Sequence, residues 1–204
     1  MKKNFFKLIL PAIAAALLSS CIGLKIDRPK DNTNYHVLPP AQTSEKAEGL
    51  KEVCVNVFEV RIPSYMARSQ IVHAGKNSSV IFMADSDLWA EPLQNAATRS
   101  VVCFLSEMTN SNNIHSNLVS NSGKNSVALK INILECIGEL NGKLNFKAQY
   151  SISNSEKTVS EFFAFSTDAG AAYSEYVCAI SKALESLSLD ICKKMSVSYT
   201  HLTL

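Results

Sequence analysis

The sequence has little of what catalytic and metal-binding sites usually need. Its 204 residues include seven glycines and four histidines, and no histidine lies four positions from another ligand residue on a predicted helix. There is no G-x-S-x-G nucleophile motif and no glycine-rich phosphate loop. We therefore predict no catalytic residue, no metal and no enzymatic activity. The alternative, a hydrolase whose Ser or Cys meets a distant His, has no motif behind it. The histidines are expected on the surface or in turns: His36, His73, His115 and His201.

Cysteines are few and lack metal spacing. Five follow Cys21, and no two form a C-x-x-C pair, which argues against zinc and redox sites. In an oxidising compartment, an odd number of cysteines leaves at least one thiol without a disulfide partner in the chain. Because each has apolar neighbours, we expect buried thiols that act as small hydrophobes. The alternative is a disulfide, and Cys54 with Cys136 is the first pair to test. The five are Cys54, Cys103, Cys136, Cys178 and Cys192.

The chain also lacks a strong charge of either sign. It has 20 basic and 18 acidic residues. Three lysines and no acid lie within residues 1–20, so residues 21–204 carry 17 basic and 18 acidic residues, a net charge of −1. This balance gives no indication of a nucleic-acid partner.

The longest apolar run near the N-terminus, residues 8–18, is shorter than the ~20 residues that span a bilayer. It follows three lysines and ends in Leu18-Ser19-Ser20-Cys21. A basic start, a short apolar run and small residues are typical of a secretory signal, and this ending resembles the lipobox of bacterial lipoproteins. We predict a signal peptide at 1–20 and lipid attachment at Cys21, through a diacylglycerol and an N-acyl chain. Several chains give lasting anchorage at ~0.8 kcal/mol per buried CH2.

The first half of the remaining chain predicts a polar segment, strands and a helix. Residues 22–50 are mostly polar, with one extended patch at 35–38. Residues 52–62 predict a central strand with both faces partly covered, and shorter strands follow at 70–73 and 79–83. Asp85-Ser86-Asp87 predicts a helix N-cap before an apolar stripe from Trp89 to Met108. Asp85, Asp87 and Glu91 would then be favourable charges at a helix N-terminus; the alternative is calcium or partner binding.

The second half predicts an antiparallel meander and a long helix. After an Asn- and Ser-rich loop at 110–125 with a short strand near Ile114, apolar residues alternate at 127–133, 144–152 and 158–165, with a hairpin turn at Asn141-Gly142. A heptad-like seam predicts a helix at about 171–195 that lies across the sheet, with Asp168 as its cap. The expected fold is α+β, a two-layer sandwich of an antiparallel or mixed sheet with two long amphipathic helices on one face.

The last nine residues, 196–204, follow no periodicity and resemble the translated read-through of a sequencing adapter. We predict that they are not native. The expected organisation is then a signal peptide at 1–20, a polar tether at 21–33 and one domain at 34–195.

Two segments together indicate a family. Residues 62–72, IPSYMARSQIV, and 87–105, DLWAEPLQNAATRSVVCFL, resemble the ABC-type transport auxiliary lipoprotein family, which includes paraquat-inducible protein C. The NYHVL stretch resembles the first strand of that family, and residues 172–191 its closing helix. The resemblance spans about 34–195. The sequence departs from the family pattern at Met66, Ser69 and Leu88.

The resemblance implies a non-enzymatic lipoprotein on the periplasmic face of the outer membrane. Its partner would be a periplasm-spanning MCE-domain protein of an ABC-type lipid transport system, and Ile22, in place of Asp, agrees with the outer membrane under the sorting rule of enteric bacteria. The alternative is a lipoprotein that assists lipopolysaccharide or outer-membrane protein assembly. A homo-oligomer and the lipid carried are left open. The surface expected to bind the partner comprises Pro63, Tyr65, Arg68, Trp89 and Glu91, although Trp89 reads first as a core residue.

Overall fold

The computed structural model describes residues 32–40, 45–47, 50–76, 79–116 and 126–200. The predicted signal peptide, Cys21 and most of the predicted tether lie outside the described residues, as do His201 and most of the loop at 110–125. Within the described ranges, no helix is both long and apolar enough to cross a membrane.

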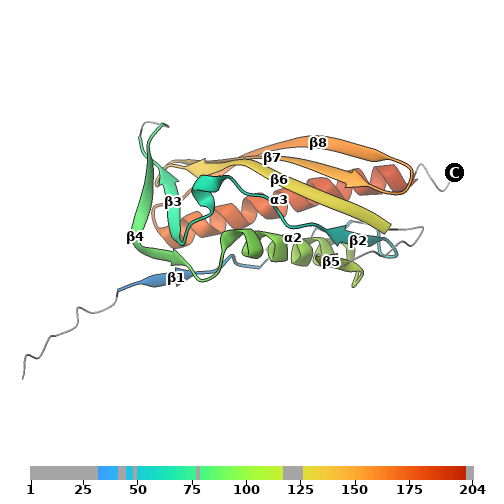
Figure 1. Cartoon of the computed structure of the whole chain (residues 1–204), viewed down its shortest axis with the longest axis horizontal. Helices are drawn as coiled ribbons and strands as arrows, with labels where there is room; N and C mark the ends of the chain where they lie inside the picture. Colours follow the sequence, from blue (N-terminus) through green and yellow to red (C-terminus); the bar gives the residue numbers. More distant parts are fainter. Residues whose placement is uncertain (1–31, 41–44, 48–49, 77–78, 117–125, 201–204) are drawn as a thin grey trace, which may run out of the picture. The chain divides into compact units, whose positions relative to one another are not determined.

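The described chain forms two long helices, one short 3-10 helix and eight strands, which make two sheets (Figure 1). In chain order the elements are β1 (Asn34–His36), β2 (Cys54–Val57), η2 (Ser64–Met66), β3 (Gln70–Ala74), β4 (Ile81–Trp89), α2 (Leu93–Thr109), β5 (Ile114–Ser116), β6 (Ser126–Gly138), β7 (Lys143–Ser153), β8 (Thr158–Asp168) and α3 (Tyr173–Thr200).

The larger sheet has the order β5-β2-β6-β7-β8. The meander β6-β7-β8 is antiparallel, as its clean alternation predicts, whereas β2 runs parallel to both β5 and β6. Every second residue of β6 and β7 is buried on one face, and both helices cover that face (Figure 1). The predicted α+β fold class is therefore confirmed. One detail was wrong: the strand predicted at 52–62 is only the four-residue β2, Cys54–Val57.

Helix α2 begins later than predicted. Pro92 occupies its N-cap position, and the carbonyl of Pro92 accepts hydrogen bonds from the N–H groups of Asn95 and Ala96. The helix ends at Asn110, whose left-handed backbone (φ 50°) suits a C-terminal cap. The apolar stripe from Leu93 to Met108 is buried. Asp85-Ser86-Asp87 is not a helix cap, because these residues lie in β4.

Helix α3 is capped by Glu175, and the predicted cap Asp168 lies in β8 instead. The Glu175 carboxylate accepts hydrogen bonds from the N–H groups of Ala171 and Ala172, which lower its pKa. The seam from Val177 to Ile191 is buried against α2, β7 and β8, as expected of a helix across a sheet. The helix continues to Thr200, five residues beyond the predicted end; the origin of residues 196–204 stays a prediction.

The second sheet was not predicted as a separate unit. It has three strands in the order β1-β4-β3, with β1 parallel to β4 and β3 antiparallel to it. An isolated bridge between Ala74 and Glu139 connects its edge to the end of β6. Two residues of the predicted polar segment 22–50 belong to the core, since Leu38 is 7% and Leu50 is 1% exposed.

The cysteine and histidine predictions hold only in part. The five described cysteines are thiols, so the candidate bridge between Cys54 and Cys136 is not formed. Cys136 and Cys192 are buried as predicted, but Cys103 and Cys178 are exposed because they lie off the apolar stripes of their helices. Three histidines lie on strands rather than in turns: His36 is paired with Asp87, His73 stacks on an aromatic ring, and His115 lies in β5.

Candidate functional site

The turn between β2 and β3 is shaped by Pro63. Its backbone (φ −58°, ψ 144°) precedes η2, and the Pro63 carbonyl accepts a hydrogen bond from the Met66 N–H at 2.9 Å. A proline fixes φ near the value that this position needs. Met66 is buried and anchors the turn, while Arg68 after it is exposed. The turn thus presents residues 67–69 at the surface.

The junction between β4 and α2 lies against this turn. The Trp89 N–H donates to the Ser69 carbonyl at 2.7 Å, and the Ala90 N–H donates to the His36 carbonyl at 2.9 Å. Trp89 is the last residue of β4 and not part of the helical stripe predicted for it. Its side chain is 7% exposed, so Trp89 is mainly a core residue. The hydrogen bond from Trp89 to Ser69 thus joins two segments that are about 20 positions apart in the chain.

A groove of about 390 Å³ lies between the turn and the junction. We call it the Trp89 groove. Its walls come from the end of the β2 segment, the turn, the junction and the first helical turn of α2. The lining residues are Ile62, Ala67, Arg68, Ser69, Trp89, Ala90, Glu91, Pro92, Leu93 and Gln94.

Two charged side chains line the Trp89 groove, Arg68 and Glu91. The Glu91 carboxylate receives two hydrogen bonds from the Arg99 guanidinium, one at 2.6 Å and a second between Nη2 and Oε1. This fork geometry lowers the pKa of Glu91. Arg68 has no salt bridge among the described residues. An anionic group on a partner would therefore meet Arg68 before any neutralising side chain.

The structure brings three of the five predicted partner-binding residues to the Trp89 groove, namely Arg68, Trp89 and Glu91. Pro63 orders the turn but does not line the groove. Tyr65 turns towards β6, where its hydroxyl accepts a hydrogen bond from the Cys136 N–H at 3.2 Å. Burial raises the pKa of Tyr65. Its role in the fold is to fasten the turn to the larger sheet.

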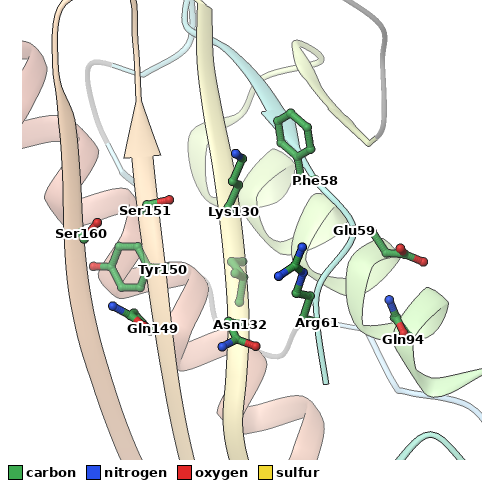
Figure 2. A pocket seen from close by; sticks show the side chains of 11 residues that line it. Phe58, Glu59, Arg61, Gln94, Lys130, Asn132, Gln149, Tyr150, Ser151 and Ser160 are labelled. Atoms are coloured by element: carbon green, nitrogen blue, oxygen red, sulfur yellow. The ribbon is translucent and has the colours of Figure 1, made fainter. Parts of the chain in front are cut away.

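A second hollow, of about 690 Å³, lies on the face of the larger sheet that the helices leave open. Figure 2 shows Phe58, Arg61 and Lys130 among the side chains that line it. The Lys130 ammonium lies 5.3 Å from the centre of the Phe58 ring, a cation–π distance. Gln94 lines both this hollow and the Trp89 groove, so the two are neighbours. The sequence signal for this hollow was weak, because it combines side chains from five separate segments.

Within the described ranges, no cluster of three His, Cys, Asp or Glu side chains could hold a metal ion. The predicted acidic cluster is dispersed: Asp87 pairs with His36 at 2.7 Å, and Glu91 pairs with Arg99. Asp85 and Asp87 lie in β4 and are therefore not charges at a helix N-terminus. The groove combines an apolar wall, one unneutralised cation and one fixed ion pair.

Comparisons with known proteins agree with this geometry. Residues 35–192 match the family model described as "ABC-type transport auxiliary lipoprotein component". A crystal structure described as an uncharacterized protein is similar at a TM-score of 0.66 with 17% identity, over 80% of this chain and 98% of that one. A protein from Xanthomonas campestris, described as DUF330, is similar at 0.66 with 11% identity, over 84% and 99%. Both likenesses concern the fold alone. No curated protein matches the chain.

Proposed function

This chain belongs to the family of ABC-type transport auxiliary lipoprotein components, and from that membership we propose that it serves an intermembrane lipid transport system of the MCE type. In this proposal Cys21 carries the acyl chains, the outer membrane holds them on its periplasmic side, and the domain docks on the periplasm-spanning MCE protein. The protein acts as a non-enzymatic adaptor. The observation that carries the proposal is the family match over residues 35–192.

The sequence before the domain supports anchoring by lipid. Its signal-like start ends in Leu18-Ser19-Ser20-Cys21, and the thiol of the last residue can accept a diacylglycerol. Two or more acyl chains hold a protein at a membrane lastingly, whereas one chain binds reversibly. Ile22, rather than Asp, follows the acylated residue, which supports the outer membrane over the inner membrane.

The Trp89 groove is the proposed docking surface for the MCE protein. A protein interface needs an apolar centre in a pocket and a polar rim. The groove offers Trp89, Leu93 and Ile62 as its apolar lining and Arg68 at the surface. Because Glu91 is already held by Arg99, Arg68 is the charge free to select an acidic partner.

The family match favours transport over assembly of lipopolysaccharide or outer-membrane proteins, because the family is described as a transport component. The genes beside this one offer a simple check. Neighbouring genes for an MCE protein and a permease are expected under the proposal, and genes for an assembly machine would contradict it.

The docking surface is tested by reversing one charge in the full-length lipoprotein. Arg68→Glu should lower capture of the co-encoded MCE protein by about tenfold or more, because it places an acid against an acidic partner. Lys157→Glu is the matched control: it makes the same change of charge in the turn between β7 and β8 and should leave capture unchanged. Equal capture by both variants would rule out the groove, and no capture by the wild type would rule out the partner.

A further inference from the structure

The hairpin formed by β3 and β4 carries an exposed apolar run that the proposed docking surface does not use. Val80, Ile81, Phe82 and Met83 are consecutive in the chain and are 46%, 44%, 52% and 50% exposed. Soluble domains seldom leave such a run in water unless it has a function. We infer that this run, Val80 to Met83, inserts into the lipid leaflet that holds the acyl anchor.

Both faces of β4 are apolar where the strand leaves the polar turn. Successive side chains of a strand point to opposite faces, so Ile81 and Phe82 lie on opposite sides while both remain about half exposed. A protein partner that packs on the hairpin would cover one face and leave the other exposed to water. A lipid leaflet surrounds an inserted hairpin and covers both faces. The two-sided exposure therefore favours lipid as the occupant.

Strand pairing and ring contacts hold the hairpin in one conformation. Ala74 pairs with Ile81 and His73 with Phe82, and the Gly75 N–H donates to the Val80 carbonyl at 2.8 Å. The ring of Phe82 stacks on His73 at 5.6 Å between centroids, and His73 meets Tyr173 of α3 at 5.8 Å. This row of rings braces the hairpin against the start of the long helix.

Glycine is required where the Phe82 ring crosses the opposite strand. A Cβ atom at Gly75 would lie 2.6 Å from Cε2 of Phe82, closer than real contacts allow. The close approach keeps Phe82 upright at the hairpin, although 52% of its surface stays exposed. The apolar side chains are thus presented before any partner arrives, which lowers the ordering cost of insertion.

The charge of the hairpin also suits a phospholipid surface. Residues 70–84 contain no Asp or Glu, and their single charged side chain is Lys76. Lys76 is exposed beside the turn. A lysine can place its stem among acyl chains and its ammonium at the phosphate level. An acidic residue near the tip would oppose such insertion, and the first one, Asp85, comes two residues after Met83 on the way back to β1.

The length of the chain before β1 allows the anchor and the hairpin to enter one leaflet. The twelve residues 22–33 separate Cys21 from β1, and they can span at most about 43 Å when extended. β1 pairs with Asp87–Trp89 of β4, about 24 Å along the strand from Val80 at 3.4 Å per residue. The reach of the tether exceeds this distance. Figure 1 shows β3 and β4 at one end of the larger sheet, away from the end of α3.

The inference rests on the proposed lipid anchor, and tryptophan reporters test it in the acylated full-length lipoprotein. The protein is reconstituted into phosphatidylethanolamine–phosphatidylglycerol vesicles with or without brominated acyl chains, which quench tryptophan on contact. The variants are Phe82→Trp and Ile81→Trp on the two faces of the hairpin. Phe162→Trp, on β8 and 61% exposed, is the matched control. The constant signal of Trp89 is subtracted using the wild type.

Bromination should reduce the added signal about twofold or more at positions 82 and 81, because an inserted side chain sits ~5–10 Å into the acyl boundary. The added signal at position 162 should stay unchanged. Quenching at neither hairpin position, at only one of them, or equally at 162 would overturn the inference. Flotation of the wild type separates the two ideas. If the protein floats with the vesicles but shows no quenching, hairpin insertion is wrong and the lipid anchor stands. If the protein does not float, both the lipid anchor and hairpin insertion are wrong.

Discussion

The two sheets of this protein treat their apolar side chains in opposite ways. In β7 the residues Leu144, Phe146 and Tyr150 are each 1% exposed or less, whereas Phe82 and Met83 in β4 are half exposed. The larger sheet has two helices on its inner face, whereas the three-stranded sheet contacts β6 through β3 and the start of α3 through His73. The larger sheet buries one apolar face, whereas the smaller sheet buries Ile71, Ala84 and Trp89 and leaves Val80 to Met83 exposed.

The contrast indicates where stability and where binding reside. Burying a large apolar side chain contributes about 1.5–3 kcal/mol, so the larger sheet and the helices must supply most of the folding free energy. The smaller sheet adds fewer buried side chains, among them Ile71 and Trp89, and its exposed side chains are free to vary. The Trp89 groove lies where the smaller sheet meets α2, so binding features gather on that side.

The largest expected effect compares one phenylalanine from each sheet. Phe146→Ala should lower the free energy of unfolding by about 3–5 kcal/mol, because it leaves a cavity in the core. Phe82→Ala should lower it by less than about 1 kcal/mol, since the ring is half in water. Urea unfolding followed by circular dichroism measures both. Equal losses would remove the distinction between the sheets.

Thiol reactivity tests the packing of the larger sheet and its two helices, which together carry both buried and exposed cysteines. Burial raises the pKa of Cys136 and of Cys192 to about 12, and a buried, protonated thiol reacts slowly. Cys103 and Cys178 are exposed and should react with maleimide at least ~100-fold faster, because the buried pair reacts only on opening of the core. Peptide mass spectrometry after timed labelling gives the rates, with labelling in urea as the control. Fast labelling of Cys136 would contradict the packing described.

A smaller effect is expected from a single hydrogen bond under the sheet. The Tyr150 hydroxyl donates to Asp190 of α3 at 2.6 Å, so Tyr150→Phe should cost about 1–2 kcal/mol. Burial, with the Asp190 charge, raises the pKa of Tyr150 above its usual range. Its neutral form therefore stabilises the fold fully below about pH 10, and this stability is lost as the pH rises further. The variant should lose less stability than the wild type in that alkaline range, as urea midpoints at two pH values will show.

The sequence predicted the regular parts of the fold because their patterns are local. The alternation in β6, β7 and β8 and the seam of α3 each repeat with one period over ten or more residues. One face of each element consequently packs towards the core, fully buried in β6 and β7 and half-buried in β8, and its type and position follow. The turn at Asn141-Gly142 was predicted for the same reason.

The sequence failed where distant segments decide the local structure. Asp85-Ser86-Asp87 fits a helix cap as well as a strand, and the pairing of Asp87 with Asn34, 53 residues earlier, selects the strand. The same pairing places Trp89 in β4. No local pattern reports a partner strand so far away, so the second sheet was missed.

The candidate site, like the fold, was predicted only in part. The family resemblance indicated Arg68, Trp89 and Glu91, and the hydrogen bond from Trp89 to Ser69 brings their segments together. The turning of Tyr65 towards Cys136 and the capture of Glu91 by Arg99 depend on tertiary packing. They could not be read from residue spacing.

Labelling with radioactive palmitate tests the central claim most directly, namely that acyl chains on Cys21 hold this transport component at the outer membrane. The wild type should take up the label and sediment with outer membranes. The Cys21→Ser variant should take up none and appear in the soluble periplasmic fraction. A serine variant that still sediments with outer membranes would contradict the account.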